Sequence, residues 1–291
     1  MTRLKWKIAG HALSLLATVL LGGLLSATLV RLAPGFDADE RELDPHLSAQ
    51  SVQALRESRR QDHNVFRFYW TYMRSAASGD LGTSLALGQP VRALLRERVP
   101  LTLRLLSTGL GLAWILALTL SLTAAWLRLS IYDVMTTLVS GSLLCIPAAV
   151  LALVSVLWNV PGSLAIALIV FPPSYRYAHN LLVKAYSRPH ILAARARGLG
   201  EGRILFWHVV PVVTPQLLAL AGVSVSMAVG AAIPVEALCG LPGIGQLAWQ
   251  AALARDLPLL VNITVLVTLV TLLANSGADV IGQMIRAQEA R

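Results

Sequence analysis

The sequence predicts an all-α protein that crosses a membrane about six times. Of its 291 residues, 56% are hydrophobic and only 13% are charged, whereas soluble domains carry about 25% charged residues. The mean hydropathy of +0.66 excludes an ordinary water-soluble enzyme with one core, and equally a disordered chain. Several apolar segments also reach the ~20 residues that a helix needs to cross a bilayer.

The first predicted span is Ile8 to about Leu32. A secretory signal peptide is the alternative, because Arg3, Lys5 and Lys7 resemble its charged region. The apolar stretch of a signal peptide is normally about 7–15 residues, and this one is nearly twice as long. We therefore expect an uncleaved helix, with residues 1–33 holding the N-terminal tail and the first span.

A polar, extracytoplasmic segment is expected at residues 34–100. Its acidic and basic residues cancel, so the net charge of +9 lies elsewhere in the chain. An apolar stripe at helical spacing predicts a small folded cap on the membrane surface. The stripe consists of Phe66, Tyr69, Trp70 and Met73.

The remaining residues, 101–291, are expected to form the membrane core. Five further apolar segments run along it: Leu101–Leu127, Val134–Trp158, Ser163–Val183, Val212–Pro234 and Pro258–Met284.

The distribution of basic residues predicts that both termini are cytoplasmic. With that orientation, the cytoplasmic pieces hold Arg3, Lys5, Lys7, Arg128, Arg176, Lys184, Arg188, Arg195, Arg197, Arg203, Arg286 and Arg291. The short outer connection at residues 159–162 has no charge, and the connection at 238–257 has Arg255 as its one base. Short cytoplasmic loops of membrane proteins are enriched in Lys and Arg.

The loop at about residues 185–211 predicts two short helices joined by a glycine-rich corner. Ser187 followed by Pro189 is typical of a helix start, and Pro211 and Pro215 are expected to end the second helix. Small residues on the first helix would let another protein approach closely, and the arginines suit an acidic partner or lipid headgroups. A basic loop that merely obeys the charge rule is the alternative.

The spacing of this loop resembles the EAA loop of ABC importer permeases. That motif is Glu-Ala-Ala, three residues, Gly, nine residues and Ile-x-Leu-Pro. Four positions match it: Ala193, Ala194, Gly198 and Pro211. Three depart from it: Leu192, His208 and Val210. The run Ala194–Leu199 is similar to the loop of the dipeptide/oligopeptide/nickel branch of these permeases.

Other patches resemble the same branch, in unchanged order along most of the chain. They are Leu32–Gly35, Gly79–Ser84, Pro100–Leu103, Ile146-Pro147, Val235–Gly245 and Ala254–Asp256, followed by Asn275 and Asp279.

The resemblance implies an ABC type I importer permease fold in the cell's inner membrane. Such a subunit forms half of a translocation pathway for peptides, nickel or another small solute. Its partners would be a second permease (by family precedent a related, different chain), two cytosolic ATPases and an extracytoplasmic solute-binding protein, which the cap could help to receive. The chain itself has no P-loop: none of Lys5, Lys7 and Lys184 stands between Gly and Ser or Thr. We expect no catalytic residue and no cofactor.

Two sets of site residues follow from the resemblance. The ATPase-coupling set is Ala193, Ala194, Arg195, Arg197, Gly198, Leu199, Glu201, Arg203 and Pro211. The candidates for the translocation pathway or outer gate are Glu236, Pro242, Gly243, Gly245, Asp256, Asn275 and Asp279. Gly243 and Gly245 favour a tight turn over binding. Asp279 is either an intramembrane group or an interfacial one that pairs with Arg286.

Other chemistry has weaker support. The six histidines show no metal-ligand spacing, and two distant cysteines do not make a disulfide framework. An ion-coupled secondary carrier is the alternative function, but it needs ionisable residues paired at mid-membrane, and Asp133 and Asp279 sit near span ends. A membrane-bound enzyme would need a motif such as Gly-x-Ser-x-Gly or His-Glu-x-x-His.

Overall fold

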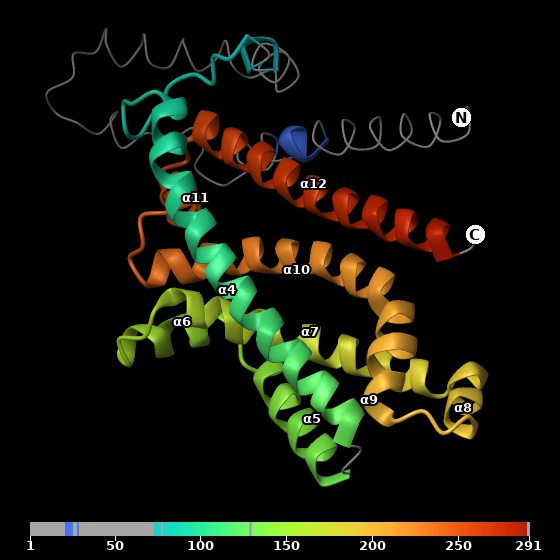
Figure 1. Ribbon diagram of the computed structural model, residues 1–291. Helices are drawn as coiled ribbons and strands as arrows, with labels where there is room; N and C mark the ends of the chain where they lie inside the picture. Colours follow the sequence, from blue (N-terminus) through green and yellow to red (C-terminus); the bar gives the residue numbers. More distant parts are fainter. Residues whose placement is uncertain (1–20, 26–27, 29–72, 77, 128–129, 290–291) are drawn as a thin grey trace, which may run out of the picture. The chain divides into compact units, whose positions relative to one another are not determined.

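The computed structural model describes residues 21–25, 28, 73–76, 78–127 and 130–289 (Figure 1). Most of the predicted first span and of the cap lies outside these residues. Within them the regular structure is helical, apart from one isolated β-bridge between Thr83 and Pro90. The expected all-α class is confirmed for this part of the chain.

The main helices carry the labels of Figure 1. They are α4 (Val91–Leu127), α5 (Ser130–Leu144), α6 (Ala148–Leu157), α7 (Gly162–Tyr186), α8 (Pro189–Ala196), α9 (Glu201–Ile204), a π-helical turn (Leu205–Val209), α10 (Val210–Leu238), α11 (Ile244–Leu253) and α12 (Leu257–Glu289).

Three of the described helices are long and apolar enough to cross a membrane: Val91–Leu127, Glu201–Leu238 and Leu257–Ile285. A fourth candidate is the pair α5 and α6, which meets at a bend of 94°. The predicted apolar segment from Val134 to Trp158 is therefore helical but divided into two helices. Pro147 precedes α6, and a proline both lacks an N–H and disfavours helical geometry in the residue before it.

The predicted span Ser163–Val183 is indeed helical, as the larger part of α7. Among the described helices, however, α7 is not one that meets the hydropathy requirement for a span, because two prolines lie near its middle and polar residues such as Arg176 follow them. The structure thus supports a helical protein with several membrane spans, while the number six stays a prediction.

The chain divides into two compact units, which are described separately: residues 1–98 with 247–269, and residues 99–246 with 270–291. In the second unit, α7 and α10 run side by side, and α5 and α6 pack against α7 (Figure 1). Small residues let helices approach closely there. A Cβ on Gly109 of α4 would lie 2.8 Å from the Ile166 side chain of α7, the kind of crossing common between membrane helices.

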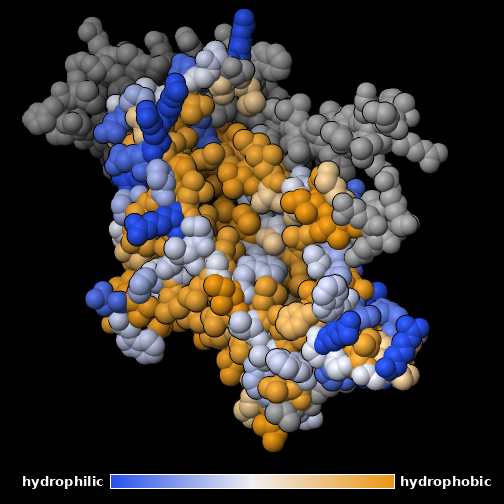
Figure 2. Space-filling model, viewed as in Figure 1, coloured by the Kyte–Doolittle hydropathy of each residue, from blue (hydrophilic) through white to orange (hydrophobic). Residues whose placement is uncertain are grey.

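Many apolar side chains point outward. On α5 the exposed residues include Ile131, Val134, Met135, Leu138 and Val139. Figure 2 shows apolar side chains over much of the face that it presents. Contiguous apolar surface of this kind is costly in water and expected in lipid.

Candidate functional site

The predicted coupling loop has the expected two-part form. Pro189 lies in the first turn of α8, and Gly198 makes the corner with a φ of +79°, a conformation that favours glycine. The cap is not the expected one. Arg188 is the N-cap residue of α8 and no side chain caps the helix, while the Ser187 hydroxyl donates to the Lys184 carbonyl at 2.9 Å.

The loop has a hydrophobic core of its own. Ile191 and Ala194 of α8 are buried together with Ile204, Leu205 and Val209. The residues that complete this cluster are Leu182, Ala185 and Tyr186 of α7, Ala125 of α4 and Val213 of α10. Burying a large aliphatic side chain stabilises by roughly 1.5–3 kcal/mol. The loop is therefore packed onto the ends of α7 and α10 without help from another protein.

An ion pair spans the corner. The Arg195 Nε donates to Glu201 Oε1 at 2.8 Å, and the guanidinium lies 5.8 Å from the centre of the Tyr186 ring, within cation–π range. Burial, with a smaller effect from the charge of Glu201, raises the pKa of Tyr186 to about 12, so its hydroxyl is protonated at neutral pH. Arg195 and Glu201 therefore act first within the loop itself.

The two motif alanines have different surroundings. Ala194 is only 5% exposed and belongs to the loop core, so its side chain packs within the protein and not on the outward surface of the loop. Ala193 is exposed, as are Arg197 and the apolar Leu192. The outward surface of the loop is thus a small apolar patch with an arginine beside it.

The second helix does not end at Pro211 as expected. It continues from α9 through the π-helical turn into α10, whose first turn holds Pro211. Proline has no N–H to donate to the preceding turn, and here it follows directly on the irregular π-helical turn. The π turn leaves Phe206 and Trp207 exposed, and such turns occur often at functional sites. Arg203 is exposed as well.

Glu236 is one of two fully buried carboxylates among the predicted pathway residues. It lies near the end of α10, is fully buried, and accepts hydrogen bonds from the Thr102 hydroxyl at 2.7 Å and the Gly245 N–H at 2.6 Å. A Cβ on Gly243 would lie 2.3 Å from the Glu236 carboxylate. The glycine is needed for this close approach. A tight bend does end at Gly243, whose N–H donates to the Leu241 carbonyl at 2.8 Å, and Gly240, just after α10, has a φ of +64°.

A second buried carboxylate, Asp256, lies in the other compact unit. It accepts from the Leu259 N–H of α12 at 3.1 Å, from the Ser84 hydroxyl, and from the Ala86 N–H at 3.1 Å. The side chain of Asn262 also donates to a backbone carbonyl of the Ser84 segment. Two patches of the predicted signature, far apart in sequence, are thus joined in space.

The other predicted pathway residues are less constrained. Asn275 of α12 donates to the Ser226 hydroxyl at 3.0 Å, whereas Pro242 and Asp279 are exposed. The pairing of Asp279 with Arg286 lies outside the described side chains. The structure therefore brings Glu236, Gly243 and Gly245 together within one compact unit, and Asp256 belongs to the other.

Comparison with known proteins decides the family. Residues 127–288, more than half of the chain and including the whole loop, match the family described as binding-protein-dependent transport system inner membrane component. The chain belongs to this family. It is a permease subunit of a binding-protein-dependent ABC importer, located in the inner membrane and non-catalytic. Such a permease works in a complex with ATPases and a solute-binding protein.

Relatives match the permease over most of its length. The oligopeptide transport system permease protein AppB of Bacillus subtilis is 25% identical, over 90% of this chain and 92% of its own length. The corresponding OppB of Escherichia coli is 27% identical, over 84% and 85%. The glutathione transport system permease protein GsiC of Escherichia coli is 25% identical, over 92% and 94%. The suspected family is therefore confirmed.

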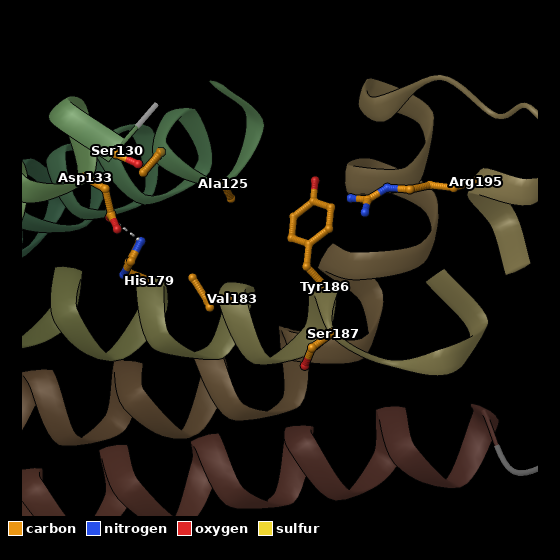
Figure 3. A pocket seen from close by; sticks show the side chains of 9 residues that line it. Ala125, Ser130, Asp133, His179, Val183, Tyr186, Ser187 and Arg195 are labelled. Atoms are coloured by element: carbon orange, nitrogen blue, oxygen red, sulfur yellow. Dashed lines mark ion pairs between the residues drawn. The ribbon is translucent and has the colours of Figure 1, made fainter. Parts of the chain in front are cut away.

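The permease also has a polar pocket that the sequence did not indicate. It has a volume of about 400 Å³ and lies among α4, α5, α7 and the coupling loop. Figure 3 shows Asp133 and His179 facing each other on one side and Tyr186 and Arg195 on the other. The His179 Nε2 lies 2.8 Å from the Asp133 carboxylate. The membrane helices and the coupling loop together form the wall of this pocket, so a shift of the loop changes the shape of the pocket.

Proposed function

We propose that this permease imports peptides, as half of a pathway completed by a second, related but different permease chain. The solute class is supported by the names of relatives that match nearly the whole chain, which are oligopeptide and glutathione permeases. The long-range tie between Ser84 and Asp256 adds support, because it joins two patches that resemble the peptide branch. Nickel remains the alternative solute.

We propose further that the loop at residues 185–211 transmits the movement of the ATPases. The observation that carries this proposal is the packed core of the loop, since a loop that only obeyed the charge rule would need no buried Ile191 or Ile204. Because this core is shared with α7 and α10, a displacement of the loop is transmitted to both helices. Its contact surface would be Leu192, Ala193 and Arg197, with the remaining residues of the coupling set holding the loop in shape.

The topology and the pathway follow from the family and the charge distribution. We propose a type I importer fold with six spans, both termini in the cytoplasm and residues 34–100 outside, where the cap helps to receive the solute-binding protein. The pathway and its outer gate would lie near Glu236, Pro242, Gly243, Gly245, Asp256, Asn275 and Asp279. Each of these residues would either contact the solute or position other residues of the pathway.

Uptake into proteoliposomes tests the proposed function. Vesicles that contain the permease, its partner permease and the ATPases, with external binding protein, are expected to accumulate a labelled peptide only with internal ATP. Vanadate should stop this uptake, and a protonophore should not. Uptake that resists vanadate and collapses with the proton gradient would instead identify the ion-coupled carrier. Accumulation of labelled nickel but not peptide would refute the proposed solute class.

A further inference from the structure

We propose that Glu236 is a positioning residue, an ionised carboxylate that latches the segment Cys239–Gln246 onto α4 and α10 and does not contact the transported solute. This inference rests on the proposed import function for its meaning in transport. All the contacts that carry it lie within a single compact unit of the chain.

The hydrogen-bond partners of Glu236 are all donors. The Thr102 hydroxyl accepts the N–H of Ile244 at 2.8 Å and donates to Glu236 Oε1 at 2.7 Å. The other carboxylate oxygen receives the N–H of Gly245 at 2.6 Å and that of Gln246 at 3.4 Å. An ionised carboxylate accepts only, whereas a protonated acid would point its own O–H at one of these donors. The arrangement therefore favours the ionised form.

The position of these N–H groups explains why a charge is tolerated in a buried site. Residues Ile244, Gly245 and Gln246 form the first turn of α11, where the N–H groups lack partners within the helix. The partial positive charge of a helix N-terminus stabilises an anion, and hydrogen bonds to an ionised group are roughly twice as strong as neutral ones. Glu236 thus caps α11 from a different helix, and Thr102 of α4 takes part in the same network.

The Glu236 carboxylate is enclosed by the protein. The Glu236 side chain has 0% exposure, and Gly243 covers the carboxylate so closely that a Cβ would lie 2.3 Å away. Gly245 also lies close against α10, where a Cβ would be 2.7 Å from the Ala232 carbonyl oxygen. A solute cannot reach the charge without first displacing the segment. The carboxylate therefore determines where the segment lies rather than which solute passes.

Glu236→Gln tests the latch by two readings on the intact transporter. Hydrogen exchange should become at least tenfold faster at the backbone N–H groups of Gly245 and Gln246. The glutamine side chain replaces one acceptor oxygen of the carboxylate by an NH2 group, which cannot accept their hydrogen bonds. Uptake of cationic, neutral and anionic peptides should fall by one common factor. A selective loss of the uptake of cationic peptides would show that the Glu236 carboxylate contacts the solute in the pathway, and it would overturn the proposal. Unchanged exchange would overturn it as well.

A second pair of variants covers the case in which Glu236→Gln fails to assemble. Thr102→Val removes one donor to the carboxylate and the acceptor of the Ile244 N–H, so exchange at Ile244 should accelerate. Thr102→Ser keeps the hydroxyl and should restore wild-type exchange. Equal exchange in the two variants would refute the latch. The exchange reading needs no transported solute, so a wild-type transporter that imports no peptide refutes the proposed function and leaves the latch to be decided by exchange.

Discussion

Ala194→Trp is expected to abolish association with the ATPases while the protein still inserts into the membrane. Ala194 is buried in the loop core beside Ile191 and Ile204, and an indole has no room there. Overpacking of a core typically costs about 1–3 kcal/mol, and sometimes more, which is comparable to the ~1–3 kcal/mol of a typical allosteric coupling. Limited proteolysis of the loop, together with co-purification of the ATPases, measures the effect.

Ala193→Trp is the matched comparison on the neighbouring, exposed position. It should leave the loop as resistant to protease as the wild type, because no core contact is lost, but weaken ATPase association by about tenfold. Pro161→Trp, at an exposed position before α7, is the control. Gly162 is unsuitable as a control, since a Cβ there would lie 2.9 Å from the Leu241 side chain. Equal protease sensitivity of the Ala193 and Ala194 variants would contradict the described loop core.

Gly222→Val is expected to separate α10 from α12. A Cβ on Gly222 would lie 2.9 Å from the Ala278 Cβ and 3.0 Å from Asn275, so the helices must move apart and the bond between Asn275 and Ser226 is strained. An overpacking cost of about 1–3 kcal/mol corresponds to a fall of roughly 2–10 °C in melting temperature. Thermal unfolding of the purified subunit, followed by circular dichroism, is the measurement.

Gly230→Val is the control, because it lies on the same helix and no atom stands within 4 Å of its added Cβ. Gly230→Val has the same loss of glycine and the same gain of a β-branched side chain. Comparing the two variants therefore isolates the effect of the close contact between α10 and α12. A melting temperature lowered equally in both variants would show that the close approach of α10 and α12 is not what makes Gly222 sensitive.

Local patterns predicted much of the fold. Long apolar runs indicated the membrane helices, and Pro189 and Gly198 indicated the start and corner of the coupling loop, because proline and glycine restrict or extend backbone geometry at their own positions. The same reasoning failed where a proline has two compatible roles. Pro211 predicts a helix end but lies in the first turn of α10, and the apolar run Val134–Trp158 does not indicate the break before α6, which Pro147 marks.

Contacts between distant residues could not be predicted in this way. Thr102 and Glu236 are 134 residues apart, and Ser84 and Asp256 are 172 apart. Neither pair leaves a periodic signal, because each partner is a single polar residue in its own segment. The glycines near Glu236 were noticed, but their role in a close approach depends on a side chain that only the fold brings to them.

Site-directed cross-linking tests the central claim, that the outward face of the coupling loop binds the ATPases. Ala193→Cys, in a chain whose Cys145 and Cys239 are replaced by Ser, is treated with a short bifunctional maleimide in the assembled, ATP-hydrolysing transporter. We expect an adduct between the permease and an ATPase subunit that carries an accessible cysteine, and none for Leu153→Cys on the exposed face of α6. An adduct at position 153 and none at 193 would contradict the account.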